Sequence, residues 1–495
     1  MSLPPGISDD ADRNRVAALD LVQRLQAALR REDRADSVEL IGRLVTMRAP
    51  MGGQWVQLAI IAANNGEVTL ARRAIDLHVE NPGGDRAGPY RKVGLLSLIG
   101  AWDEALGLLR SLPEDLPDPA SYAYSRGTAA LYVGEGTEAR EYLEKAIRLH
   151  SQAGSPWLSL ATLVDFACEP ELADRIVAAE REMTNATTAE RATYYYALGK
   201  AHADLGEHAA AFDAFFRAAA LMKPQQAYSR EKDRLTATEA VSGYDIERIA
   251  AIARQQAEPT ARTIFVHGLP RSGTTLVEQV LTAHSEVSDG GEVDRLSLFA
   301  WEIEGLSCAR LEAYAEQVGT TEAARLWNHW MDERFPAPGR VVDKSFTTSR
   351  YLGLAAALLP EAPLIWLRRN PLDCAWSCFR NRFAGGVPWS YDLADIAFHF
   401  RLEDELLARW QEILGERLLV VPYEPMVNEP EPWIRRILAH CGLLEEAGPF
   451  APHRNRRTVT TSSVTQVRQP IDRRGIGVAE PYREFLAPFI DAYFD

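Results

Sequence analysis

A glycine-rich segment in the second half of the chain could bind a phosphate group. The segment FVHGLPRSGTT (265–275) places Gly268, Gly273 and Thr275 as in the nucleotide pattern G-x-x-x-x-G-K-[ST]. Thr274 stands where that pattern has the lysine that reaches the γ-phosphate. Backbone N–H groups, hydroxyls and the following helix N-terminus could still hold a single phosphate-like anion. A glycine-rich turn without a ligand is the alternative.

A second candidate phosphate site follows the apolar segment PLIWL. The sequence RNPLDCAWS runs from Arg369 to Ser377, so an arginine at a strand end precedes a serine by two helical turns. Such a pair can converge on one phosphate. Cys374 and Cys378 lie four residues apart in the same segment, which is typical of helical packing rather than of a metal site.

Together the two segments resemble the signatures of sulfotransferases that use 3′-phosphoadenosine 5′-phosphosulfate (PAPS). The first resembles the 5′-phosphosulfate loop, and the second resembles the R-x-P-x-D-x-x-x-S signature that binds the 3′-phosphate. The likeness covers about residues 260–485 and is closest to tyrosylprotein sulfotransferases and to bacterial proteins that join tetratricopeptide repeats to a sulfotransferase domain. It implies PAPS contacts from Pro270, Arg271, Ser272, Gly273, Thr274, Thr275, Arg369 and Ser377.

The same resemblance implies the catalytic residues. Glu292, 21 residues after Arg271, matches the glutamate that acts as the base in the tyrosylprotein enzymes, and Lys344 matches their catalytic lysine. Lys344 and Arg271 would neutralise charge on the departing phosphate oxygen and on the sulfate. The alternatives are purely structural roles, in which Glu292 caps a helix and Lys344 pairs with Asp343.

Three further cofactor contacts come from the C-terminal part. By resemblance, Ser463 contacts the phosphosulfate and Tyr423 lies near the nucleotide, although Tyr423 could equally be a core residue. Residues 451–475 hold six arginines against one aspartate, which suits a cofactor with several anionic groups. Arg474 is the expected cofactor contact there, and a solvated basic surface is the alternative.

The acceptor of the sulfonyl group stays open between a protein tyrosine and a carbohydrate or small-molecule hydroxyl. Phe383, Trp389 and Tyr391 could line its site or belong to the core. A kinase with a degenerate loop and a repeat scaffold with a non-catalytic nucleotide-binding domain are the competing functions. The first conflicts with Thr274, and the second predicts damage at Glu292 or Lys344 that the sequence does not show.

The elements that must position these residues alternate between strand and helix. Apolar segments predict strands at 262–267, 340–342, 363–367 and 417–421, with helices at 274–283, 346–359, 372–383 and 392–414 between them. This order predicts a P-loop-like α/β domain with a parallel sheet, whose ligands bind beyond the carboxyl ends of the strands.

The first half repeats every 34 residues. Ala71, Ala105, Ala139 and Ala173 keep this period, as do Gly66, Gly100 and Gly134. The pattern resembles the tetratricopeptide repeat and predicts an all-α solenoid, with a further copy around Gly199 and Phe215. A solenoid could bind a peptide or protein partner on its concave face, brace the second domain, or form a homodimer. We expect the repeats over 1–256 and the sulfotransferase domain over 257–495.

Length, net charge and cysteine content limit the possible domain number, partners and cellular location. A chain of 495 residues is too long for a single hydrophobic core, so two or more domains are expected. The net charge of −15 disfavours nucleic acid and anionic membranes as partners. No signal-peptide pattern is visible, and the five cysteines have no metal-ligand spacing, so a cytoplasmic, metal-independent enzyme is expected.

Overall fold

The computed structural model describes residues 7–81, 85–383, 385–454 and 469–495. It separates into two compact units, which are Met1–Ala129 with His329–Pro336, and Ala130–Asn328 with Ala337–Asp495. The boundary expected near residue 256 divides the chain by function rather than by compactness, and it stays a prediction.

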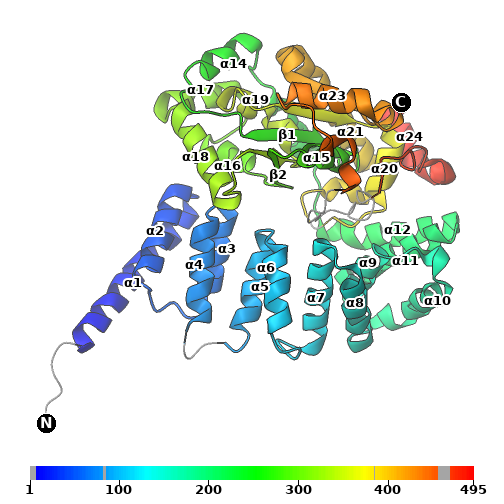
Figure 1. Cartoon of the computed structure of the whole chain (residues 1–495), viewed down its shortest axis with the longest axis horizontal. Helices are drawn as coiled ribbons and strands as arrows, with labels where there is room; N and C mark the ends of the chain where they lie inside the picture. The colour runs from blue at the N-terminus through cyan, green and yellow to red at the C-terminus, as the bar shows by residue number, and fades with distance from the viewer. Residues whose placement is uncertain (1–6, 82–84, 384, 455–468) are drawn as a thin grey trace. The chain divides into compact units, whose positions relative to one another are not determined.

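The N-terminal part is helical, as expected, and its helices follow one another as hairpins (Figure 1). Within the first unit, α3 packs on α4 and α5 packs on α6. The helix α7 extends into the second unit. These helices are α1 (Ile7–Arg30), α2 (Arg34–Thr46), α3 (Gln54–Asn64), α4 (Val68–Val79), α5 (Gly88–Leu98), α6 (Trp102–Ser111) and α7 (Pro119–Val133).

The 34-residue period corresponds to repeated structural positions. The alanines of the period lie in α4, α6, α8 and α10, and each is at most 4% exposed. Gly66, Gly100 and Gly134 follow first helices with φ of 88°, 77° and 99°, a backbone region that L side chains rarely adopt. A Cβ on Gly199 would lie 2.6 Å from the Phe215 ring, so this glycine lets α11 and α12 approach closely.

The second unit begins with further helices and continues into the sheet. The hairpin of α11 and α12 is followed by α13 and α14, and α13 packs against α19 and α21 of the sheet region. The helices that precede the sheet are α8 (Gly136–Leu149), α9 (Gly154–Ala161), α10 (Pro170–Ala178), α11 (Thr188–Asp204), α12 (His208–Met222), α13 (Arg230–Ala240) and α14 (Ile246–Ala253).

A five-stranded parallel sheet in the order β2-β3-β1-β4-β5 forms the second half, which confirms the expected parallel sheet. Four strands lie where the sequence predicts them. The fifth, β2, was not predicted, because three residues are too few to show a strand pattern. The strands are β1 (Thr263–Gly268), β2 (Val287–Asp289), β3 (Arg340–Asp343), β4 (Leu364–Arg368) and β5 (Leu418–Pro422).

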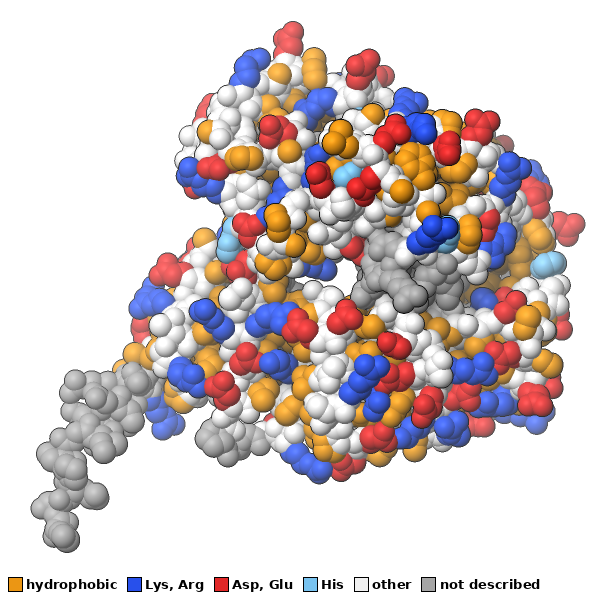
Figure 2. Space-filling view, viewed as in Figure 1, with side chains coloured by type: hydrophobic (Ala, Val, Ile, Leu, Met, Phe, Trp, Pro, Cys, Tyr) orange, Lys and Arg blue, Asp and Glu red, His pale blue; other side chains and the backbone are white. Residues whose placement is uncertain are grey.

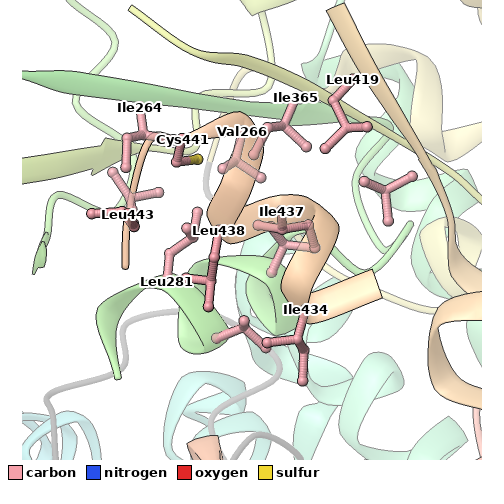
Figure 3. Close-up of a cluster of buried hydrophobic side chains, with 14 of the residues drawn as sticks. Ile264, Val266, Leu281, Ile365, Leu419, Ile434, Ile437, Leu438, Cys441 and Leu443 are labelled. Carbon is pink, nitrogen blue, oxygen red and sulfur yellow. The ribbon is translucent and has the colours of Figure 1, made fainter. Parts of the chain in front are cut away.

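Helices cover both faces of this sheet. On one face α15 and α23 enclose a core to which the strands contribute Ile264, Val266 and Ile365 (Figure 3). On the other face α19 contacts β1 and α21 contacts β5. The helices of this half are α15 (Thr274–Thr282), α16 (Leu296–Glu302), α17 (Cys308–Gln317), α18 (Thr320–Arg334), α19 (Thr348–Leu358), α20 (Pro371–Phe379), α21 (Leu393–Leu414), α22 (Tyr423–Asn428), α23 (Pro430–His440) and α24 (Ala487–Phe494).

Short 3₁₀ helices connect several elements. They are η1 (Phe166–Cys168), η2 (Ala179–Asn185), η3 (Lys223–Gln225), η4 (Pro388–Tyr391), η5 (Gly415–Arg417), η6 (Gly448–Phe450), η7 (Pro452–Arg454) and η9 (Glu480–Leu486).

The surface mixes charges of both signs. Acidic and basic side chains are interspersed over the face shown in Figure 2, so the net charge of −15 forms no single acidic patch there. Within the described ranges, no helix is both long and apolar enough to cross a bilayer.

Candidate active site

The glycine-rich loop connects β1 to α15, as the sequence predicts. Gly268 leaves no space for a side chain, because a Cβ there would lie 2.5 Å from Ser272 Oγ. Gly273 has φ 105°, and a Cβ on it would lie 2.6 Å from the Tyr423 ring. Helix α15 starts at Thr274, so its first N–H groups and its positive dipole end face the loop. The hydroxyl residues Ser272, Thr274 and Thr275 are buried.

Arg271 adopts a backbone conformation that is unusual for a residue with a side chain. Its φ of 70° lies in the left-handed region. Burial and the neighbouring Arg369 lower the pKa of the Arg271 guanidinium. The loop therefore carries both backbone strain and an electrostatic cost, which are common at ligand sites.

The second signature contacts this loop directly. Arg369, just after β4, donates from Nη1 to the Arg271 carbonyl oxygen at 2.6 Å and from Nη2 to the Gly475 carbonyl oxygen. Its guanidinium lies 4.8 Å from the centre of the Tyr423 ring. Ser377 is buried on α20, which begins two residues after Arg369. The structure thus brings together two segments that are 98 residues apart.

The C-terminal segment is fixed to the same helix. Asp373 on α20 accepts hydrogen bonds from the backbone N–H groups of Gly477 at 2.8 Å and Ala479 at 2.9 Å. Arg474 is exposed and pairs with Asp472 and Gln469 of its own segment. The structure does not bring Arg474 onto the loop, and Ser463 lies outside the described residues.

Glu292 and Lys344 form an ion pair, with Lys344 Nζ 3.1 Å from Glu292 Oε1. The Lys344 side chain is 1% exposed, whereas that of Glu292 is 43% exposed. Burial alone would lower the pKa of Lys344, but the carboxylates of Glu278 and Glu292 outweigh it and raise that pKa. Lys344 therefore stays charged, and one carboxylate that it neutralises is open to an incoming acceptor.

The backbone around Glu292 is attached to the end of β3. Lys344 N donates to Gly291 O at 2.8 Å, and Asp294 N donates to Ser345 Oγ at 2.8 Å. Ser345 Oγ in turn donates to Asp343 Oδ1 at 2.5 Å. Asp343 thus pairs with Ser345 rather than with Lys344, and these bonds set the distance between the carboxylate and the ammonium.

Two half-exposed aromatic side chains lie beside this pair. Lys344 Nζ lies 5.4 Å from the centre of the Phe346 ring, and the Phe346 and Phe383 rings meet edge to face with centroids 6.4 Å apart. Trp389 and Tyr391, by contrast, are each 5% exposed. Trp389 and Tyr391 therefore belong to the core, and Trp389 also stacks on His399.

Sequence reasoning missed Arg380 and Glu278, and it assigned no separate role to Asp373, the aspartate of the second signature. Arg380 caps the end of α20 beside the Trp376 ring, and within the described part of the chain it makes no ion pair or hydrogen bond through its guanidinium. Burial and then Arg271 lower its pKa to about 10. Its spacing offered a weak signal, since Arg380 follows Ser377 by three residues and shares its helix face. Glu278 offered none, because it lies mid-helix among apolar residues.

The donor set suits a nucleotide with two anionic groups. Ser272 Oγ and Arg369 Nε are buried and have no hydrogen-bond partner within the described residues. Both atoms lie where the two signatures meet. Among the described residues, no group of three His, Cys, Asp or Glu side chains could hold a metal ion.

Comparison with known proteins agrees with this geometry. Residues 263–446 match the family model described as "Sulfotransferase family". An uncharacterised protein of Aquifex aeolicus is 26% identical over 410 residues, which cover 78% of this chain and 52% of that protein. A Drosophila melanogaster protein-tyrosine sulfotransferase is 26% identical over 185 residues, 35% of this chain and 37% of that protein. The chain thus spans about half the length of the first of these relatives and less of the second.

Solved sulfotransferases are also similar in part. The sulfotransferase domain of a Synechococcus olefin synthase is 19% identical with a TM-score of 0.31, covering 46% of this chain and 97% of that one. A sulfotransferase from Mycobacterium avium is 15% identical with a TM-score of 0.31, covering 65% of this chain and 95% of that one. The match of residues 263–446 to this family model supports the expectation of a sulfotransferase enzyme.

Proposed function

We propose that the protein transfers a sulfonyl group from PAPS to an acceptor hydroxyl. The observation that carries the proposal is the contact between the two signatures, Arg369 Nη1 to Arg271 O at 2.6 Å. One signature alone could be a structural turn. Two that meet at adjacent strand ends define a single site for both anionic ends of one nucleotide.

PAPS would lie against the loop residues Pro270 to Thr275 and against Arg369, Ser377 and Tyr423. When bound, it supplies an activated sulfonyl group whose bond to the departing phosphate oxygen breaks as the bond to the acceptor oxygen forms. Ser463 and Arg474 stay candidates for further contacts, although Arg474 would have to leave Asp472 to make one.

Glu292 accepts the proton that the acceptor hydroxyl releases. Its partial exposure gives an acceptor access to the carboxylate, and the ion pair with Lys344 orients that carboxylate. The ammonium of Lys344 and the guanidinium of Arg271 stabilise negative charge on the departing oxygen. The carboxylate of Glu292 and the ammonium of Lys344 already lie together in their ion pair, so little reorganisation of these two groups would precede the reaction.

The acceptor is an aryl hydroxyl, such as a protein tyrosine. Phe346 and Phe383 form a half-exposed aromatic surface beside the Glu292–Lys344 pair, and aromatic rings pack favourably edge to face or offset. The helical hairpins would be tetratricopeptide repeats that bind the acceptor protein or another partner. Under this proposal they occupy 1–256 and the sulfotransferase domain occupies 257–495.

Nucleotide binding is the first test. Adenosine 3′,5′-bisphosphate at a hundred times its Kd should stabilise the full-length protein by about 2.7 kcal/mol in thermal melting, whereas ATP with Mg²⁺ should have a much smaller effect. Arg369→Ala should remove the stabilisation. The exposed Arg483, which pairs with Glu480, gives a matched control in Arg483→Ala. Equal stabilisation by ATP–Mg²⁺, or none by the bisphosphate, would contradict the proposal.

The base is tested by Glu292→Gln, which keeps the shape of the side chain and removes its basicity. With a tyrosine peptide pool or host lysate as acceptor and radiolabelled PAPS as donor, kcat should fall roughly 10²–10⁴-fold. The affinity for adenosine 3′,5′-bisphosphate should stay unchanged. A variant with near wild-type turnover would place the base elsewhere.

A further inference from the structure

The carbonyl group of Pro270, in the middle of the glycine-rich loop, accepts two hydrogen bonds from thiols. Cys374 Sγ lies 3.2 Å from Pro270 O and Cys378 Sγ lies 3.1 Å from it. The two cysteines are one helical turn apart on α20, so their side chains lie next to each other. Both are at most 1% exposed.

The Cys378 thiol stays protonated and can donate. Burial raises the pKa of the Cys378 thiol well above its usual value, and the adjacent Cys374 thiol adds to this. A thiol is a weak donor, but a carbonyl oxygen has two lone pairs and can accept from both sulfurs. No other hydrogen bond to this carbonyl is present among the described residues.

These contacts determine the direction of the next backbone N–H. In a planar trans peptide, C=O and N–H point to opposite sides. Because the thiols hold the Pro270 carbonyl toward α20, the Arg271 N–H must point away from α20. The Arg271 carbonyl is held in turn by Arg369 Nη1. Both carbonyls that flank Arg271 are therefore attached to the second signature segment.

The strain at Arg271 fits this attachment. A φ of 70° at Arg271, followed shortly by φ 105° at Gly273, is costly for a residue with a side chain and persists only where its surroundings enforce it. Left-handed residues within a turn let successive N–H groups converge on one anion. The thiols and Arg369 hold the two carbonyls that flank Arg271 and so contribute to enforcing this geometry.

We propose that Cys374 and Cys378 are positioning residues that orient the Arg271 N–H toward the anionic group at the 5′ end of the nucleotide. This inference rests on the proposed function, because it assumes a nucleotide with a 5′ anionic group in the loop. It assigns the two cysteines a role that neither packing nor metal binding describes. The 3′ end of the nucleotide, bound elsewhere in the site, should not depend on them.

The test compares two nucleotides on the full-length protein by calorimetry. Replacing both thiols by Cys374→Ala and Cys378→Ala should weaken adenosine 3′,5′-bisphosphate about tenfold, since two weak hydrogen bonds are lost. Adenosine 3′-phosphate, which has no 5′ anion, should bind with unchanged affinity. Replacing both by serine keeps a donor at each position and should restore most of the affinity for the bisphosphate.

A matched control removes a buried thiol elsewhere. Cys441 is 1% exposed in the core beside α23, so Cys441→Ala should leave the affinities for both nucleotides unchanged. Equal weakening of both nucleotides, or no rescue by serine, would overturn the positioning role while leaving the proposed function intact. A wild-type protein that binds neither nucleotide would overturn both. If the double alanine variant does not fold, Cys374→Ala alone must show the same selectivity between the two nucleotides in smaller degree.

Discussion

Two clusters of buried charge in the second unit differ in how their charges are compensated. The first lies under β1, where Asp233, Arg350, His399 and Glu403 bond to one another. The second lies at the strand ends, where Arg271, Arg369 and Arg380 lie near one another. The first contains both signs of charge. In the second, Arg369 adds to the electrostatic cost of Arg271, and both add to that of Arg380.

The contacts in the first cluster are complete. Asp233 accepts from Arg350 Nη2 at 2.7 Å, from His399 Nδ1 at 2.6 Å and from Tyr228 OH at 2.7 Å. Burial alone would raise the pKa of Asp233, but the bonds from His399 and Arg350 lower it instead. A cluster of this kind stabilises one arrangement of α13, α19 and α21 and needs no ligand.

In the second cluster, the neighbouring charges are unfavourable to one another. Burial and then Arg369 lower the pKa of Arg271, and burial and then Arg271 lower that of Arg380. Like charges that lie together cost free energy in the absence of an anion, and Asp204 offsets this cost only in part at Arg380. We therefore expect the first cluster to stabilise the fold and the second to respond to a bound anion.

The largest effect is expected in the compensated cluster. Asp233→Ala leaves the Arg350 guanidinium, whose side chain is 9% exposed, with one carboxylate fewer, and should cost about 3–5 kcal/mol of stability. Hydrogen exchange of amides in β1 and α21 measures this loss without assuming that the whole chain unfolds in one step.

Glu231→Ala, an exposed carboxylate on the same helix, gives the control and should change stability by less than about 1 kcal/mol. Similar protection from hydrogen exchange in Asp233→Ala and wild type would show that α13 does not stabilise the sheet through this cluster. The first cluster would then not be a stabilising one.

Arg380→Ala should have the opposite profile. Without nucleotide, the removal of one like charge should leave stability unchanged or slightly higher. With adenosine 3′,5′-bisphosphate, the loss of a charge-assisted contact should weaken binding by about 1.5–3 kcal/mol, roughly 10- to 150-fold. Calorimetry and melting of the same samples measure both quantities.

Arg483→Ala is again the control, because Arg483 is exposed and pairs with Glu480 on the surface. If Arg380→Ala destabilises the ligand-free protein and leaves nucleotide affinity intact, Arg380 belongs with the stabilising residues and the second cluster is smaller than we infer.

The sequence predicted the parts of this comparison that depend on local pattern. Apolar segments followed by glycine or arginine located β1 and β4 and therefore the places of Arg271 and Arg369. Buried small residues at a fixed period located the helical hairpins. The first signal lies beside the strand that it predicts, and the second recurs once in each helical hairpin.

Contacts between distant segments were not predictable in this way. Asp233 lies in a polar stretch that reads as a fading repeat, yet its partners Arg350 and His399 are 117 and 166 residues away. Trp389 was open between the acceptor site and the core, because only the stacking on His399 decides it. The roles of Glu292, Lys344 and Ser377 stay predictions that rest on the family resemblance and on the proximity described here.

The smallest effect concerns Asp343, at the end of β3. Burial raises the pKa of Asp343 to about 6, from its usual value of 3.8. Between these two pH values the folded protein holds a proton that the unfolded chain has released, so the Asp343 contribution to stability falls as pH rises. His399, whose pKa burial lowers to about 4, contributes with the opposite sign, because the unfolded chain binds protons there that the folded protein excludes.

The two contributions overlap between about pH 4 and 6, so the wild-type stability curve alone cannot separate them. Asp343→Asn can still accept the bonds from Ser345 N and Oγ, but it carries no charge at any pH. Relative to wild type it should be equally stable near pH 4 and on the order of 1–3 kcal/mol more stable at pH 7. Urea unfolding at both pH values measures the difference, and Glu316→Gln, on the exposed side of α17, should show no such change. A pH-independent difference between Asp343→Asn and wild type would mean that Asp343 is ionised throughout, and that the bond from Ser345 outweighs burial in setting its charge.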